Sequence, residues 1–307
     1  MDYAHGITAI DTCFFRKNFD AAYLVIENGR AAFIDVGTNF SVPGLIATLR
    51  GKGLDVDAVD WVIPTHVHLD HAGGAGELMR QLPNAKLVIH PRGAKHLIDP
   101  DKLIAGAAAV YGVDEVRRTY GDIVPVAGAR VIEALDGHVV DLAGRPLLCI
   151  DTPGHARHHL CVWDACSRSF FTGDTFGLSY REFDTANGAF ILPTTSPVQF
   201  DPDELRASIR RMLEYRPEAM FVTHFGRITD VERLAADLLV QIDTMVAIVR
   251  RHADSGDRHE RVMADLAELY LSRAEAHGVT MTREHMRDLL AMDIVLNAQG
   301  LEIWVDR

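Results

Sequence analysis

The segment His-x-His-x-Asp-His at residues 66–71 constrains this chain more than any other part of its sequence. It follows a short apolar run that predicts a β-strand. Because residues i and i+2 share one face of a strand, His66 and His68 can direct both imidazoles to one point. Asp70 and His71 offer a carboxylate and an imidazole to a second point nearby. Imidazole and carboxylate ligands together suit zinc, iron or manganese.

Three further potential ligands stand where predicted strands end. His155 closes the segment Asp-Thr-Pro-Gly-His, Asp174 closes Phe-Phe-Thr-Gly-Asp, and His224 closes Phe-Val-Thr-His. Sites are commonly built at such strand ends, because the rigid scaffold holds the ligands in place. A set of histidines satisfied by backbone hydrogen bonds is the alternative. Three histidines and an aspartate within six positions argue against it.

The composition limits the class of protein. The chain has 307 residues, of which 48% are hydrophobic, so it can bury a sizeable core. This proportion of hydrophobic residues excludes disordered, collagen-like and low-complexity classes of protein. With 43 acidic and 31 basic residues the formal net charge is −12, so no basic surplus is available to bind a nucleic-acid backbone. A small-molecule substrate is the expected partner.

No targeting or membrane segment stands out. The N-terminus carries Asp2 where a secretory signal would carry a cation, and no apolar stretch follows it. The best membrane-span candidate, Leu238–Val249, is short and contains Asp243. The four cysteines are scattered without metal or redox spacing, which fits a reducing compartment. We therefore expect a soluble cytoplasmic protein that does not associate with membranes.

Periodicity and turn residues predict alternating strands and helices up to His224. Asn28-Gly29 between two apolar runs predicts a hairpin with a type I′ turn. Residues 91–120 are helical in pattern but interrupted by Gly106 and Gly112, which is typical of a mobile cover. Short runs between residues 124 and 174 predict an antiparallel meander, and residues 177–199 a loop near the site. The other predicted elements are helices at 42–52, 73–81 and 203–215 and strands at 61–64, 86–90 and 219–223.

After His224 the sequence pattern is purely helical. Residues 229–232, Thr-Asp-Val-Glu, have the spacing of a capping box. A long apolar stripe follows, and two more amphipathic helices are predicted at 258–277 and 283–297.

The order His-x-His-x-Asp-His, Gly-His, Gly-Asp and His resembles the metallo-β-lactamase superfamily over roughly residues 5 to 226. The resemblance implies an α/β (α+β) fold, a four-layer αββα sandwich with two metal ions at the sheet edges. We expect a metallo-β-lactamase-like domain over residues 1–228 and a C-terminal helical extension over residues 229–307. The extension would either wall the substrate pocket or form the contact of a homodimer. Residues 91–120 could form the opposite wall.

The resemblance also implies a ligand set for two divalent metal ions, with zinc expected first and iron or manganese as alternatives. His66, His68 and His155 would hold one ion. The second ion would be held by Asp70, His71 and His224, and Asp174 would bridge the two. His159 matches a histidine that the superfamily often carries, and we interpret it as a hydrogen-bond partner that fixes a ligand.

Two such ions would share a water and lower its pKa toward neutrality, which provides a bridging hydroxide. Asp70 is the candidate catalytic residue that orients this water and passes its proton to the leaving group, although it could serve as a ligand alone. Asp174 stands where true zinc β-lactamases have a cysteine. The chain is therefore more similar to the glyoxalase II, lactonase and thioesterase branches, which implies hydrolysis of a small ester, thioester or lactone.

The substrate is less constrained than the metal site. Residues 175–181 lack the Gly-Cys-Gly-Arg type segment of glyoxalase II, and Gly177 stands where quorum-sensing lactonases have a tyrosine. Arg157, Tyr180 and Arg181 are candidates for binding an anionic substrate group, with solvated loop residues as the alternative. An iron-dependent oxidoreductase that resembles the persulfide dioxygenases of the same fold is the second hypothesis for function.

Overall fold

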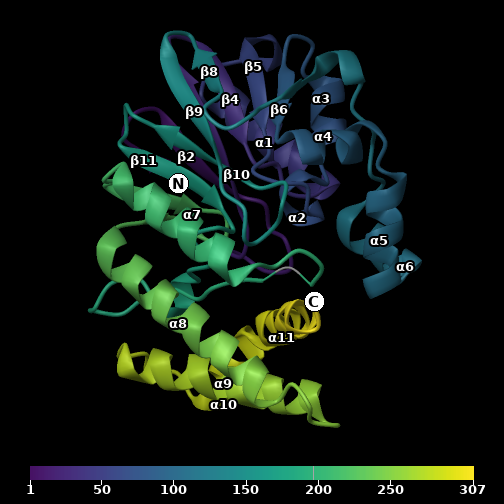
Figure 1. Ribbon diagram of the computed structural model, residues 1–307. Coiled ribbons are helices and arrows are strands. Elements are labelled where there is room, and N and C mark those ends of the chain that lie inside the picture. The colour runs from purple at the N-terminus through teal and green to yellow at the C-terminus, as the bar shows by residue number, and fades with distance from the viewer. Residues whose placement is uncertain (196) are drawn as a thin grey trace.

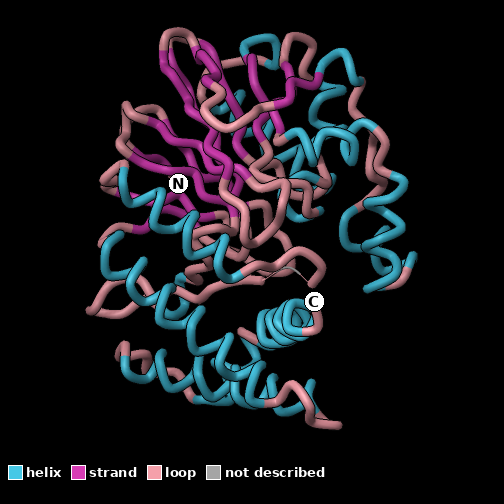
Figure 2. The backbone as a smooth tube through the Cα atoms, viewed as in Figure 1, coloured by secondary structure: helices cyan, strands magenta, loops and turns pink. Residues whose placement is uncertain are grey.

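The structure is a computed structural model that describes residues 1–195 and 197–307. At its centre two mixed β-sheets lie face to face, and helices cover their outer faces (Figure 1, Figure 2). This is the αββα sandwich that the sequence predicted, followed by a region that is helical. Among the described residues, no helix combines the length and the hydrophobicity that crossing a bilayer requires.

The first sheet has the order β1-β2-β3-β4-β5-β6-β7. Its strands are β1 (Asp2–Tyr3), β2 (Ile7–Asp11), β3 (Ala21–Glu27), β4 (Arg30–Ile34), β5 (Val59–Ile63), β6 (Lys86–Ile89) and β7 (Val131–Glu133). Strands β1 to β4 pair antiparallel, and β4 to β7 pair parallel. Asn28 and Gly29 connect β3 and β4 with φ of 47° and 76°, which confirms the predicted hairpin turn.

The second sheet has the order β13-β12-β11-β10-β9-β8. Its strands are β8 (Val139–Leu142), β9 (Arg145–Asp151), β10 (Leu160–Asp164), β11 (Ser169–Gly173), β12 (Ala219–Val222) and β13 (Gly226–Ile228). The meander prediction was wrong for residues 129–135, because β7 pairs parallel with β6 in the first sheet. The sequence also missed β13, which is too short to show a period of its own.

Most helices agree with the predictions, but α2 (Leu69–Ala72) was not predicted, and the single helix predicted at 283–297 is two helices, the second of which ends at Val305. The helices are α1 (Val42–Gly51), α2 (Leu69–Ala72), α3 (Ala75–Gln81), α4 (Pro91–Ile98), α5 (Asp101–Tyr111), α6 (Val113–Tyr120), α7 (Pro202–Glu214), α8 (Val231–Arg251), α9 (Arg258–Ala276), α10 (Arg283–Leu289) and α11 (Ala291–Val305), with 3-10 turns at Asn39–Ser41, Val56–Ala58, Gly128–Arg130 and Arg181–Phe183. Gly106 lies inside α5 and does not interrupt it. The predicted capping box does not form, because Asp230 precedes α8 with a left-handed φ of 59° and makes no side-chain cap.

Three apolar cores hold the layers together. Aromatic rings fill the space between the sheets: Tyr23 of the first sheet lies 5.2 Å from Phe171 of the second, measured between centroids. Helices α1, α3 and α4 bury their apolar faces on the first sheet. Helix α7 and the C-terminal helices share the core on the other side. Segments that follow β4, β5, β9, β11 and β12 consequently meet at one edge of the sandwich, where the predicted ligands lie.

Candidate metal centre

The predicted ligand segment bends into a short helix. Strand β5 ends at Ile63, so His66 and His68 lie in the loop after the strand rather than on its last residues. His68 is the residue before α2, and Asp70 and His71 belong to that helix. The bend brings all four side chains toward the same edge of the sandwich.

The first group of ligand atoms comes from three segments. Nε2 of His66 lies 2.8 Å from Nδ1 of His68, which lies 3.1 Å from Nε2 of His155. Oδ2 of Asp174 is 3.3 Å from the same nitrogen of His155. The atoms that these four side chains offer all lie within 4.8 Å of one another, close enough to surround one cation.

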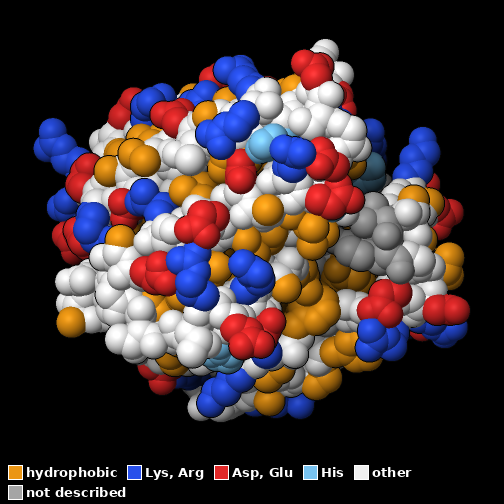
Figure 3. Space-filling model, turned by 90° about the horizontal axis from the view of Figure 1, so that it is seen from below, with side chains coloured by type: hydrophobic (Ala, Val, Ile, Leu, Met, Phe, Trp, Pro, Cys, Tyr) orange, Lys and Arg blue, Asp and Glu red, His pale blue; other side chains and the backbone are white. Residues whose placement is uncertain are grey.

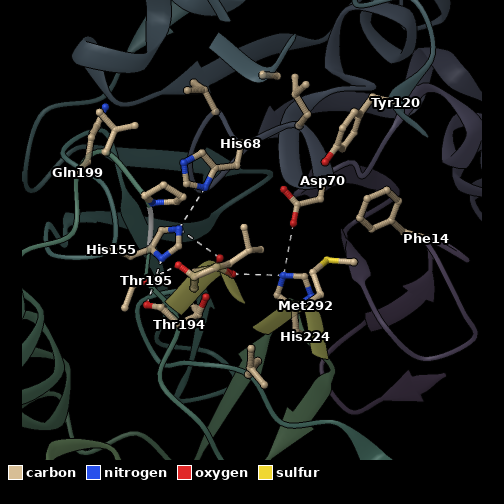
Figure 4. Close-up of a pocket in the computed structure, with 18 of the residues that line it drawn as sticks. Phe14, His68, Asp70, Tyr120, His155, Thr194, Thr195, Gln199, His224 and Met292 are labelled. Carbon is tan, nitrogen blue, oxygen red and sulfur yellow. Dashed lines mark hydrogen bonds and ion pairs between the residues drawn. The ribbon is translucent and has the colours of Figure 1, made fainter. Parts of the chain in front are cut away.

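The second group lies beside the first. Oδ2 of Asp70 is 3.6 Å from Nε2 of His71 and 3.6 Å from Nε2 of His224. Figure 4 shows His68 and His155 on one side of the centre and Asp70 and His224 on the other. The structure thus brings all seven predicted ligands together, in the two sets that the sequence match implies.

Asp174 connects the two groups. Its Oδ1 lies 3.3 Å from Nε2 of His71 and 3.5 Å from Nε2 of His224, while Oδ2 faces His155. Oδ1 of Asp174 and Nε2 of His71 are both buried without a hydrogen-bond partner among the described residues. Buried polar atoms are normally satisfied, so two that face each other in this way fit a shared cation.

The protonation states of His66 and His68 agree with ligands that present lone pairs. Burial lowers the pKa of His66 well below its ordinary value and that of His68 to about 3, so both imidazoles are neutral at pH 7. Burial would also lower the pKa of His71, but the carboxylates around it, Asp174 foremost, raise it well above its ordinary value. A negative potential of this kind attracts a cation. The donor set and its surroundings therefore indicate that the cluster binds a divalent metal.

A second layer of groups orients the ligands. Oδ2 of Asp35, the residue after β4, is 2.9 Å from Nδ1 of His71. The backbone carbonyl of Phe19 lies 3.0 Å from Nδ1 of His224. The backbone carbonyl of Thr194 lies 3.4 Å from Nδ1 of His155. Such partners fix which ring nitrogen faces the metal. Asp35 was not predicted from the sequence, where a lone aspartate after an apolar run is a weak signal. In the structure its φ is 53°.

His159 lies beneath the centre, next to Asp174. Its Nε2 accepts a hydrogen bond from the backbone N–H of Asp174 over 3.1 Å, and its Nδ1 lies 3.0 Å from the hydroxyl of Thr152. His159 thus contacts the backbone of one predicted ligand, and its role in fixing that ligand stays a prediction. Its neighbour His158 is also buried, and its ring stacks against that of His66.

Two of the three substrate-binding candidates, Tyr180 and Arg181, separate in the structure. Tyr180 lines the pocket, where its hydroxyl donates to Asp293 over 3.2 Å. Arg181 does not line it, because its guanidinium folds back onto the carbonyl and hydroxyl of Ser179 and pairs with Asp184. The hypothesis that Arg181 binds substrate therefore has no support in this geometry.

A pocket of about 450 Å³ opens above the metal centre. Most of its lining is apolar, and aromatic residues of the N-terminal segment form one side: Phe14, Phe15 and Phe19. Helices α5 and α11 also line it, and they lie in the two segments that the sequence predicted as walls, residues 91–120 and the C-terminal helices. On the face seen from below, hydrophobic side chains gather around a hollow (Figure 3).

Comparison with known proteins agrees with this geometry. Residues 18–224 match the family described as the metallo-beta-lactamase superfamily, and the chain belongs to that superfamily. The resemblance drawn from the ligand motifs is thereby confirmed.

Curated relatives cover part of the chain. It is 33% identical over 178 residues to the metallo-beta-lactamase fold-containing protein ST1585 of Sulfurisphaera tokodaii, which spans 57% of this chain and 63% of that protein. It is 28% identical over 160 residues to a hydroxyacylglutathione hydrolase of a Polaromonas species, spanning 52% of this chain and 47% of that enzyme. It is 28% identical over 185 residues to the acyl-coenzyme A thioesterase MBLAC2 of Gallus gallus, spanning 55% and 62%. The chain thus spans less than two thirds of the length of each of these relatives.

A solved structure extends the likeness to the C-terminal helices. The metallo-beta-lactamase family protein TTHA1429 of Thermus thermophilus superposes with a TM-score of 0.68 at 18% identity, covering 98% of this chain and 93% of that chain. The fold, helices included, is therefore shared with another member of the superfamily.

Proposed function

We propose that this protein is a hydrolase that binds two divalent cations, zinc foremost, and cleaves a small ester, thioester or lactone. The observation that carries the proposal is the position of Asp174, whose two carboxylate oxygens face the two ligand groups at the base of an apolar pocket. The names of the relatives, a hydroxyacylglutathione hydrolase and an acyl-coenzyme A thioesterase, support acyl transfer to water.

The residues of the two groups would hold the cations, one in each group, with Asp174 between them. When bound, such cations polarise a substrate carbonyl and lower the pKa of water. The protein supplies the fixed arrangement of ligands, which Asp35 and two backbone carbonyls keep from turning.

Asp70 is the residue that we assign to proton transfer. It lines the pocket, and its side chain is 24% exposed, more than that of Asp174. Burial raises the pKa of Asp70, but His71 and His224 outweigh burial and hold it at about 2. The carboxylate is therefore ionised at neutral pH, so it can orient a water, accept its proton and pass that proton to the leaving group.

The pocket favours a substrate with an apolar acyl group. Its volume of about 450 Å³ suits a small molecule, and apolar side chains such as Phe14, Leu103 and Met292 line it beside the metal centre. Figure 4 shows Phe14 and Met292 next to Asp70 and His224. An acyl chain that lies against them would bring its carbonyl to the base of the pocket.

Elemental analysis and a substrate panel test the proposal. Protein purified without added metal should contain two zinc ions per chain and should hydrolyse at least one of a set of esters, thioesters and lactones. Asp174→Ala should lose metal and activity together, whereas Asp243→Ala, which removes an exposed carboxylate paired with Arg206, should keep both. A single iron per chain with oxygen consumption on a persulfide would contradict the proposal and favour the oxidoreductase.

A further inference from the structure

Cationic side chains gather at the mouth of the pocket on the side of α4 and α5. Four of them are exposed, and none forms an ion pair with any of the described residues: Arg92, Lys95, Lys102 and Arg157. We call these four residues the cationic rim. They come from three separate segments of the chain, so no single element explains their meeting.

Contacts between the segments place the rim at the pocket. Lys102 lines the pocket itself. The backbone N–H of Arg157 donates to Oε1 of Gln199 over 2.8 Å, and Gln199 lines the pocket too. The guanidinium of Arg92 donates to the carbonyl of Arg157 over 3.3 Å. In Figure 4, Gln199 lies on the side of His68, away from Phe14 and Tyr120.

The rim differs from the rest of the surface in its charge balance. The chain as a whole carries −12, and many exposed arginines elsewhere pair with carboxylates, as Arg50 does with Asp55, although Arg210 and Arg287 do not. Asp99 and Asp101 both precede Lys102 in the sequence, yet neither forms an ion pair with the rim. Burial, and then the charges of Lys95 and Lys102, lower the pKa of His96, which also lines the pocket. An acidic protein thus presents a locally positive mouth, and charge in a cleft raises the local concentration of oppositely charged ligands.

We propose that the cationic rim binds phosphate groups on the thiol half of the substrate, so that the substrate is a thioester of a phosphorylated thiol. Several cations spread along a mouth suit a group with several negative charges, and both Lys and Arg bind phosphate. The inference rests on the proposed function and narrows it. In this proposal the apolar side chains that line the pocket, such as Phe14 and Met292, hold the acyl chain, and the cationic rim holds the thiol half of the substrate.

The reaction is an ordinary hydrolysis. The oxygen of water forms a bond to the acyl carbon, and the bond between that carbon and sulfur breaks. One proton of the water passes to the sulfur, so the products are a carboxylic acid and a phosphorylated thiol. No oxidant or further reactant is needed.

Matched thioesters test the rim. We would compare an acyl-coenzyme A with the N-acetylcysteamine thioester of the same acyl group, which lacks phosphate. The double variant Lys102→Glu/Arg157→Glu should raise KM for the coenzyme A thioester about tenfold with kcat nearly unchanged, and should leave the neutral thioester unaffected. Arg210→Glu/Arg287→Glu makes the same change of charge at exposed residues outside the pocket and should leave both KM values unchanged. An equal effect of the rim variant on both thioesters, or none, would overturn the inference.

A binding measurement separates this inference from the proposed function. Desulfo-coenzyme A carries the phosphates but has no sulfur to bind a metal. By calorimetry it should bind the parent protein, bind about tenfold more weakly to the rim variant, and lose affinity as salt rises. If the protein hydrolyses no thioester, the proposed function fails for that class. If desulfo-coenzyme A binds parent and rim variant equally, or binds neither, the rim proposal fails.

Discussion

Nδ1 of His71 lies 2.9 Å from Oδ2 of Asp35, and both side chains are fully or almost fully buried. A ring N–H that donates to this carboxylate leaves the lone pair of Nε2 free for a cation. Asp35 also accepts hydrogen bonds from the hydroxyls of Thr65 and Thr223. The carboxylate of Asp35 therefore connects the segments that follow β4, β5 and β12 to a ligand, and its three partners fix its position.

Replacing Asp35 tests whether its carboxylate orients His71. Asp35→Asn removes the charge but tolerates the φ of 53°, because Asn is among the residues that adopt left-handed backbone most readily. We expect metal affinity to fall about 10- to 100-fold, measured by competition with a chromophoric chelator. Asp60→Asn, which only weakens a pair with Arg30, should keep the parental affinity. Unchanged affinity in Asp35→Asn would show that the carboxylate does not orient His71.

Asn297 links α11 to the metal centre. Its side-chain carbonyl accepts from the backbone N–H of Thr195 over 2.8 Å, and its amide donates to the carbonyl of Pro193 over 3.1 Å. Between them lies Thr194, whose carbonyl faces His155. The C-terminal helices thus hold the segment that orients one ligand, although they are far from it in the sequence.

Asn297→Leu would leave those two backbone groups buried and unpaired. At about 1–3 kcal/mol for each group, we expect the free energy of unfolding to fall by about 2–6 kcal/mol, and metal affinity to fall with it. Denaturant unfolding and chelator competition measure the two effects. Gln299→Leu, the same kind of change on the same helix at a half-buried residue, serves as the control. A variant with parental stability and affinity would refute the link.

Met292 lines the side of the pocket where the proposed acyl chain would lie. Its side chain is 39% exposed and lines the apolar side of the pocket. Met292→Trp should lower kcat/KM for long acyl chains at least about tenfold by filling that space, and should spare short ones. A series of chain lengths measures this. Ile303→Trp, at a residue of similar exposure on the same helix outside the pocket, should leave the chain-length profile unchanged.

The sequence revealed the ligands because each one stands in a recognisable motif at a strand end. His66 and Asp174 could be found without knowing any long-range contact. Asp35 could not, since a single aspartate after a strand is common and only the fold brings it to His71. Residues of α11 were hidden for a related reason. The helix predicted from periodicity ends at Asn297, and the pattern says nothing of what that residue contacts.

Strand pairing was the other feature that the sequence did not predict correctly. The pattern of residues 129–135 correctly predicts a strand, but its partner β6 is separated from it by three helices. A parallel pair always needs such a crossover connection, so local sequence favoured the nearer, antiparallel neighbours instead. Partner choice depends on packing of the whole sheet, which a local pattern does not contain.

Asp293 gives the protein a stability that depends on pH. The carboxylate is buried; one oxygen accepts from the hydroxyl of Tyr180, and the other has no hydrogen-bond partner among the described residues. Burial raises its pKa from 3.8 to about 6. Between these two values the folded protein binds more protons at Asp293 than the unfolded chain does. Its contribution to the free energy of unfolding is therefore largest below pH 4 and is lost as pH rises toward 6.

Asp293→Asn removes this titration while its side-chain carbonyl can still accept from Tyr180. At pH 7 we expect the variant to be more stable than the parent by up to about 3 kcal/mol, because a shift of one pKa unit corresponds to about 1.4 kcal/mol. At pH 4 the two should be nearly equal. Denaturant unfolding at a series of pH values measures the free energy of unfolding of both proteins. In the difference between them, the contributions of the other titrating groups cancel. Parallel curves across this range would mean that Asp293 has an ordinary pKa and that an ionised carboxylate is accommodated beside Tyr180 without cost.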